Sequence, residues 1–223
     1  MRTITNRIIL FLKSIKKTIK KIISEIKRNN FIAILFWLLK KNYSSPPHII
    51  KQRIVKKYAK KYSIINFIET GTYKGDMINA VKNIFKKIYS IELSPELFRE
   101  AKKRFSETNN IDLHCGDSGM LLKKILMEIK TPTLFWLDAH YSKGETVKGE
   151  TNTPVLSELE TILNHKIKNH AILIDDARCF DGTNDYPKIS EIKVFIEKRA
   201  PHYTVKTIND IIRITNFASN KNQ

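Results

Sequence analysis

Apolar and polar residues change their spacing at regular intervals along most of this chain. Short apolar runs, typical of buried strands, fall at residues 64–68, 87–91, 111–115, 133–137 and 170–174. Between them apolar residues recur every three or four positions, which predicts helices over residues 49–62, 76–86, 95–107, 118–129, 154–164 and 188–199. Strands that alternate with helices form a mostly parallel sheet covered on both faces. We therefore expect a doubly wound α/β domain.

The pattern changes after the last of these helices. Two short apolar runs, 203–206 and 211–214, flank Asn209-Asp210, and this spacing predicts a β-hairpin. The hairpin would give the sheet an antiparallel edge. We expect residues 46–217 to form this domain and residues 218–223 to form a disordered tail.

The first 45 residues form a separate, basic helical extension. Residues 4–28 place isoleucine and leucine at spacings of three and four among lysines and arginines, which predicts an amphipathic helix. The longest apolar run, residues 31–39, is shorter than the roughly 20 residues that cross a bilayer. The Ser-Ser-Pro-Pro stretch at residues 44–47 predicts a linker to the domain.

The distribution of charge distinguishes this extension from the rest of the chain. The formal net charge is +18, and residues 1–45 hold eleven Lys and Arg residues but one acid. Residues 4–41 could therefore lie on an anionic membrane surface, with the apolar face in the lipid interface. A helical hairpin packed on the domain, or on a second copy in a homodimer, explains the same pattern, and both interpretations stay open. We do not expect a nucleic-acid-binding protein, because the basic excess is not spread over a groove.

The two cysteines of the chain indicate the cellular compartment in which it folds. Cys115 and Cys179 lie far apart without a C-x-x-C spacing, and no secretory signal precedes them. We expect both thiols to be reduced and buried in a cytoplasmic protein, which the basic extension would place peripherally on the inner face of the membrane.

Acids and glycines gather where the predicted strands end. Gly71 and Gly75 follow the first strand, at positions where the backbone of an open sheet approaches a ligand. Carboxylates end or follow five successive strands: Glu69, Glu92, Asp117, Asp138 and the pair Asp175-Asp176. Acids repel one another at such short range, so they indicate an edge that binds hydroxyl groups, a cation or both.

Three motifs carry a resemblance to a known family. The E-T-G-T-Y-K-G-D stretch at residues 69–76, the acid of S-I-E-L and the later G-D-S resemble the class I S-adenosylmethionine-dependent methyltransferases, over roughly residues 62–215. The resemblance implies a Rossmann-like fold with S-adenosylmethionine as cofactor. It further implies that Glu92 holds the ribose. The other implied cofactor contacts are Glu69, Gly71, Thr72 and Gly75 along the cofactor, and Asp117 and Ser118 beside the adenine.

A nicotinamide-dependent Rossmann enzyme is the competing interpretation of the same stretch. Its G-x-G-x-x-G fingerprint has a close glycine pair and a third glycine, and residues 71–75 have neither. A carboxylate at Glu69 is also unsuited to a diphosphate but suits a sulfonium cation. We therefore favour the methyl donor.

The stretches L-D-A-H-Y-S and I-D-D-A-R point to a second ligand. Their acids Asp138, Asp175 and Asp176 end neighbouring strands, and three converging carboxylates suit Mg²⁺. This arrangement resembles the macrocin-type and cephalosporin hydroxylase-like sugar O-methyltransferases, which implies that these acids bind a divalent ion and that the ion holds substrate hydroxyls.

Other residues near these acids are candidates for catalysis and substrate binding. His140 would act as general base, with Asp138 beside it, although a structural hydrogen bond explains this histidine as well. Arg178 and Tyr141 are the candidate substrate contacts, although a salt bridge from Arg178 to Asp181 or Asp185 is an equal explanation.

These motifs together predict an S-adenosylmethionine-dependent, Mg²⁺-assisted O-methyltransferase. Its substrate would be a small molecule with a free hydroxyl, a saccharide or another polyol. The alternative is a membrane-associated binding protein in which the basic helix is the functional part and the sheet is a degenerate scaffold.

Overall fold

The structure, a computed structural model, describes residues 30–39, 45–138 and 153–216. The chain divides into two compact units, Met1–Lys51 and Gln52–Gln223. The first unit contains α2 (Asn30–Leu39) and the first residues of α3 (His48–Lys61). The second unit contains the remainder of α3 and all strands of the described residues.

The second unit follows the predicted alternation. Its strands are β1 (Asn66–Thr70), β2 (Lys87–Glu92), β3 (Ile111–Cys115), β4 (Thr133–Leu137), β5 (Ala171–Ile174), β6 (Thr204–Ile208) and β7 (Ile211–Thr215). Its further helices are α4 (Asp76–Val81), α5 (Pro95–Arg104), α6 (Ser118–Glu128), α7 (Val155–Asn164) and α8 (Ile189–Arg199), with a 3-10 helix η1 (Ala177–Cys179).

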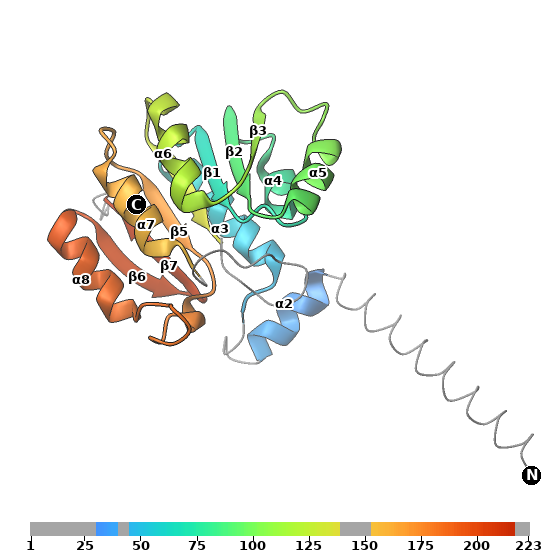
Figure 1. The fold of residues 1–223 in the computed structure, drawn as a ribbon. Coiled ribbons are helices and arrows are strands. Elements are labelled where there is room, and N and C mark those ends of the chain that lie inside the picture. Colours follow the sequence, from blue (N-terminus) through green and yellow to red (C-terminus); the bar gives the residue numbers. More distant parts are fainter. Residues whose placement is uncertain (1–29, 40–44, 139–152, 217–223) are drawn as a thin grey trace, which may run out of the picture. The chain divides into compact units, whose positions relative to one another are not determined.

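The strands form one seven-stranded sheet in the order β3-β2-β1-β4-β5-β7-β6 (Figure 1). The first five run parallel, while β7 is antiparallel to both β5 and β6. The doubly wound, mostly parallel sheet and the C-terminal antiparallel hairpin are both confirmed.

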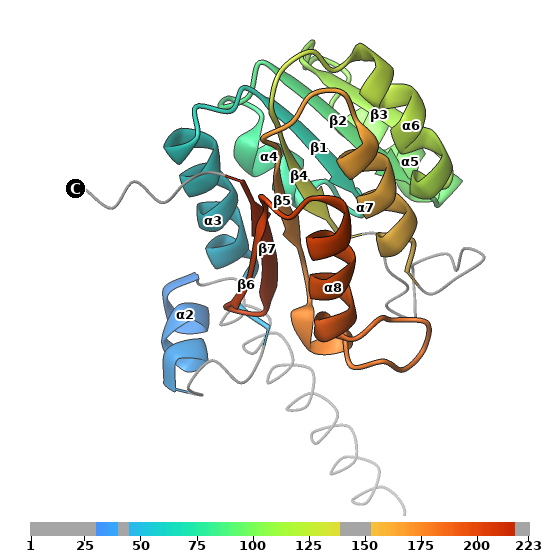
Figure 2. The same ribbon diagram turned by 90° about the vertical axis from the view of Figure 1, so that its left-hand side faces the viewer.

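Helices cover both faces of the sheet. The chain moves outward from β1 to β3 through α4 and α5, and right-handed crossovers place both helices on one face. Figure 2 shows α3 and α4 on that side of the sheet and α7 and α8 on the other. The central strands β1, β4 and β5 are buried on both faces, and Phe67, Leu134 and Trp136 are completely or almost completely buried.

Local sequence explains where α5 begins. Ser94 is its N-cap, and the Ser94 hydroxyl accepts a hydrogen bond from the Leu97 N–H at 3.3 Å, while Pro95 occupies the first helical position. The preceding strand, β2, is thereby followed after two residues by a helix, so its last residue, Glu92, is fixed at the strand end.

Two expectations need correction. The first strand comprises Asn66–Thr70 rather than residues 64–68, so Glu69 lies inside the strand. Cys115 is exposed and Cys179 is half-buried, although both are free thiols, so the expectation of two buried cysteines was wrong. In the described part of the chain, no helix is long and apolar enough to cross a membrane.

Candidate functional site

The carboxyl ends of five strands form one continuous edge. The N–H of Gly116, after β3, donates to the carbonyl of Glu92 at 2.9 Å, and the N–H of Asp138, after β4, donates to the carbonyl of Thr70 at 2.9 Å. The Asp175 N–H donates to Leu137 at 3.0 Å. The predicted acids therefore lie side by side at one edge, the usual place of ligands in an open parallel sheet.

The glycine loop is tied to the neighbouring strand. The N–H groups of Gly71 and Thr72 both donate to the carbonyl of Ile91, at 2.9 and 3.2 Å. Gly75 has φ +72°, and a Cβ there would lie 2.6 Å from Cε2 of Phe105. A side chain at Gly75 would therefore be strained and would also clash, which explains the second glycine of the motif.

Glu92 is fixed by two backbone donors. One carboxylate oxygen accepts from the Tyr73 N–H at 2.7 Å and the other from the Ser94 N–H at 2.9 Å. The residue is 7% exposed. Each carboxylate oxygen retains a second lone pair, so the fixed carboxylate can also accept hydroxyl groups such as those of a ribose.

Glu69 is a buried acid that accepts a hydrogen bond from a neutral hydroxyl group, that of Ser90. It is 2% exposed, and its carboxylate accepts from the Ser90 hydroxyl at 2.9 Å, which in turn contacts the Thr72 hydroxyl at 2.7 Å. Burial raises the pKa of Glu69 well above its ordinary value, and the nearby charges of Asp138 and Glu92 raise it further. A cationic ligand at this edge would offset the free-energy cost of ionising Glu69 in its buried position.

The predicted adenine contacts have intramolecular roles in the structure. Asp117 is the N-cap of α6, with its side chain accepting from the Met120 N–H at 3.2 Å. The Ser118 hydroxyl donates to the carboxylate of Glu158 in α7 at 2.7 Å, and both side chains are buried. These contacts fix the start of α6 after β3.

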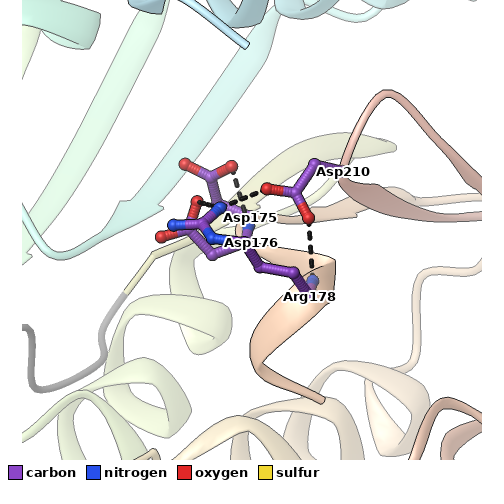
Figure 3. Close-up of polar contacts among 4 residues, drawn as sticks. All are labelled: Asp175, Asp176, Arg178 and Asp210. Carbon is purple, nitrogen blue, oxygen red and sulfur yellow. Dashed lines mark hydrogen bonds and ion pairs between the residues drawn. The ribbon is translucent and has the colours of Figure 1, made fainter. Parts of the chain in front are cut away.

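The acids after β4 and β5 differ in their surroundings. Asp138 is half-buried, whereas Asp175 is 2% exposed and accepts from the Asp176 N–H at 2.8 Å. Asp176 has φ 52° and its carboxylate pairs with Arg178 at 2.7 Å. Figure 3 shows that Arg178 also pairs with Asp210, from the turn between β6 and β7.

The predicted magnesium site does not fit this arrangement. Within residues 30–39, 45–138 and 153–216, no group of three His, Cys, Asp or Glu side chains is placed to hold a metal ion. Asp138, Asp175 and Asp176 end adjacent strands, but Asp176 is engaged by a guanidinium. The sequence suggested Asp181 or Asp185 as the partner of Arg178. In the structure Arg178 pairs with Asp176 and Asp210 instead.

Two predicted site residues lie outside the residues that the structure describes, and two residues that contact the site were not predicted from the sequence. His140 and Tyr141 belong to residues 139–152, which the structure does not describe. Glu158 and Asp210 were not predicted. A signal existed for Glu158, because it is an acid on the apolar face of α7 between Val155 and Leu159. Asp210 was assigned only to a turn.

The sequence matches no family model and no curated protein. Among solved structures, an O-methyltransferase from Bacillus cereus, in complex with S-adenosylhomocysteine (SAH), is 15% identical with a TM-score of 0.56, covering 86% of this chain and 90% of that one.

A second similar structure is TomG from Streptomyces achromogenes, an O-methyltransferase involved in tomaymycin synthesis, in complex with S-adenosylmethionine (SAM). It is 15% identical, with a TM-score of 0.54, covering 86% of this chain and 87% of that one. A third, the SAH-bound methyltransferase PaMTH1 from Podospora anserina, is 18% identical with a TM-score of 0.50 and covers 89% and 95%. The chain therefore has the Rossmann-like fold of the SAM-dependent methyltransferases.

Proposed function

We propose that the protein is a SAM-dependent methyltransferase. The observation that carries the proposal is a pair of fixed, buried acids near the carboxyl ends of adjacent strands, Glu69 and Glu92. The glycine loop that follows Glu69 leaves no room for a side chain at Gly75. The fold and the SAM-binding and SAH-binding proteins that share it support this cofactor.

Each acid has a role that its surroundings support. Glu69 would lie near the cationic methionine portion of the cofactor, because its burial without a cationic partner among the described residues favours a positive ligand. Glu92 would accept the ribose hydroxyls. When bound, the cofactor supplies an electrophilic methyl group, and the chain supplies position, orientation and exclusion of water.

The acceptor that we favour is a hydroxyl group of a saccharide or another small polyol. Carboxylates such as Asp138 and Asp175 at the strand ends accept hydrogen bonds from hydroxyl groups, and the similar structures include O-methyltransferases. His140 remains the predicted general base, with Asp138 beside it, and Tyr141 and Arg178 remain the predicted substrate contacts.

Magnesium assistance stays a prediction of the sequence alone. We derive no step through a metal, because Asp176 is paired with Arg178. The dependence of acceptor binding on Mg²⁺ decides this question separately from the cofactor.

Calorimetric titration of the full chain with SAM and SAH, with Mg²⁺ and then with EDTA, tests the proposal. We expect both nucleotides to bind with micromolar affinity in either solution. A folded protein that binds neither would contradict the proposal and return attention to nicotinamide cofactors. Polyols added to the SAH complex then identify the acceptor class.

We propose further that residues 1–45 hold the protein at an anionic membrane surface. In α2, Leu35, Phe36, Leu38 and Leu39 are between 46% and 70% exposed, an apolar surface that supports this interpretation. Co-sedimentation with phosphatidylserine vesicles at low and high salt tests it, since electrostatic attachment weakens with salt. Concentration-dependent dimerisation without vesicle binding would favour a second copy instead.

A further inference from the structure

Asp176, the second of the two acids that follow β5, contacts a cation from the chain itself. The Arg178 guanidinium lies 2.7 Å from the Asp176 carboxylate and also pairs with Asp210 (Figure 3). The acid side chains are 15% and 11% exposed, whereas that of Arg178 is 47% exposed. The guanidinium therefore lies over two largely buried carboxylates from separate elements.

The hairpin turn holds this arrangement through backbone contacts as well. Asp210 accepts a hydrogen bond from the Arg178 N–H through its side chain and another from the Ala177 N–H through its carbonyl, each at 2.8 Å. Asn209 and Asp210 both adopt positive φ, 54° and 57°. Three contacts from one turn residue thus fix both ends of the Arg178 side chain.

We propose that Arg178 is a resident cation of Asp176 and Asp210, in place of a divalent ion at Asp176, and that Asp210 positions it. The inference rests on the proposed function, because these acids lie at the edge where the acceptor would bind. A guanidinium stays charged at every physiological pH and donates to two carboxylates in a fixed plane. A metal ion at Asp176 would have to displace it.

Removal of the guanidinium should leave the Asp176 and Asp210 carboxylates as an adjacent pair that attracts a divalent ion. Mn²⁺ serves as the probe, because the electron paramagnetic resonance signal of the free ion reports binding. We expect weak binding by the full-length wild-type protein and affinity higher by about tenfold in Arg178→Met, the factor expected from about 1.4 kcal/mol of lost charge repulsion. Arg178→Lys keeps the charge and should remain weak.

A matched control removes a different paired arginine. Arg199 pairs with Glu160 at 3.3 Å between α8 and α7, so Arg199→Met should leave Mn²⁺ binding unchanged. Tight wild-type binding that is lost in Asp176→Asn would overturn the proposal, and so would an Arg178→Met protein with wild-type Mn²⁺ affinity. SAH titration of the same samples reports on the cofactor, so failure of the proposed function is seen separately.

The role of Asp210 has its own test. Asparagine tolerates positive φ and retains the acceptor for the Arg178 N–H, so Asp210→Asn keeps the turn but removes the charge. We expect phenylglyoxal to modify Arg178 several-fold faster in this variant, as measured by peptide mass spectrometry. An unchanged rate would show that Asp210 only forms the turn. Asp181→Asn, which removes an exposed carboxylate that bonds Thr183, is the control.

Discussion

At the scale of single residues, Glu92 offers the most direct test of cofactor binding. Its two oxygens accept from the N–H groups of Tyr73 and Ser94. Glu92→Gln would present an amide NH₂ to one of these donors and would lose the charge that, in the proposed function, accepts the ribose hydroxyls. We expect SAH affinity to fall by about tenfold to a hundredfold, the value of one or two hydrogen bonds to a charged group.

Calorimetric titration of Glu92→Gln beside Glu100→Gln measures this effect. Glu100 is an exposed acid of α5, so its replacement should leave the affinity for SAH unchanged. Equal affinities in both variants would mean that Glu92 does not hold the ribose.

The buried carboxyl group of Glu69 should lower the stability of the folded protein while it favours a cationic ligand. The raised pKa means that the folded protein retains this proton to higher pH than the unfolded chain does. The free energy by which Glu69 destabilises the folded state therefore grows as pH rises above its ordinary pKa of 4.5. Glu69→Gln should gain thermal stability relative to the wild type as pH rises above 4.5, while its stabilisation by SAM shrinks.

Thermal unfolding of both proteins across this pH range, with and without SAM, checks the expectation. Glutamine still offers an oxygen to the Ser90 hydroxyl, so the comparison isolates the charge. A constant stability difference across the pH range would contradict the burial argument. Undiminished stabilisation by SAM would remove Glu69 from the cofactor site.

At the scale of elements, a histidine pair joins the end of α7 to the start of β5. Nδ1 of His165 lies 3.1 Å from Nε2 of His170, and Nδ1 of His170 accepts from the Thr133 N–H at 3.1 Å. Burial, followed by the nearby His165, lowers the pKa of His170 from 6.5 to about 4. These contacts lie at the amino ends of the strands, opposite the candidate site.

The pair predicts a loss of stability in mild acid. The unfolded state takes up the His170 proton first, so the contribution of neutral His170 is complete above pH 6.5 and is lost as pH falls towards about 4. We expect a decrease of about 3 kcal/mol in the free energy of unfolding over this range. Urea unfolding at several pH values measures it.

A replacement separates this effect from general acid denaturation. His170→Gln should be less stable at neutral pH but should depend less steeply on pH between about 4 and 6.5. His202→Gln, which replaces an exposed histidine, should retain the wild-type slope. Equal slopes in all three proteins would exclude His170 as the source.

At the scale of the whole molecule, apolar periodicity located almost every element of the sheet. Residues 111–115 and 133–137 are strands in the structure, as predicted. The first strand was placed two residues early, because an apolar run reports burial whereas a strand is defined by pairing. Glu69 and Thr70 pair with β2 and β4 although they are polar.

Site residues could be predicted from the sequence only where their position follows from the end of a single strand. The positions of Glu69 and Glu92 follow from their own strands, so the sequence located them. The pairs Ser118–Glu158 and Arg178–Asp210 join residues 40 and 32 positions apart, and a single sequence contains no trace of such contacts. The pairing of Arg178 with both Asp176 and Asp210 could not be predicted for the same reason, so the acids at the strand ends suggested a metal ion.

The division of the chain into two units yields a prediction about their independence. Unit Gln52–Gln223 contains the complete sheet, with Glu69 and Glu92 at its edge, so a protein of residues 46–223 should bind SAH with the affinity of the full chain. It should also lose vesicle binding at low salt. Loss of SAH binding in a truncated protein with the wild-type circular dichroism spectrum would assign residues 1–45 a part in the site itself. Retained vesicle binding would place the membrane contact on the sheet domain.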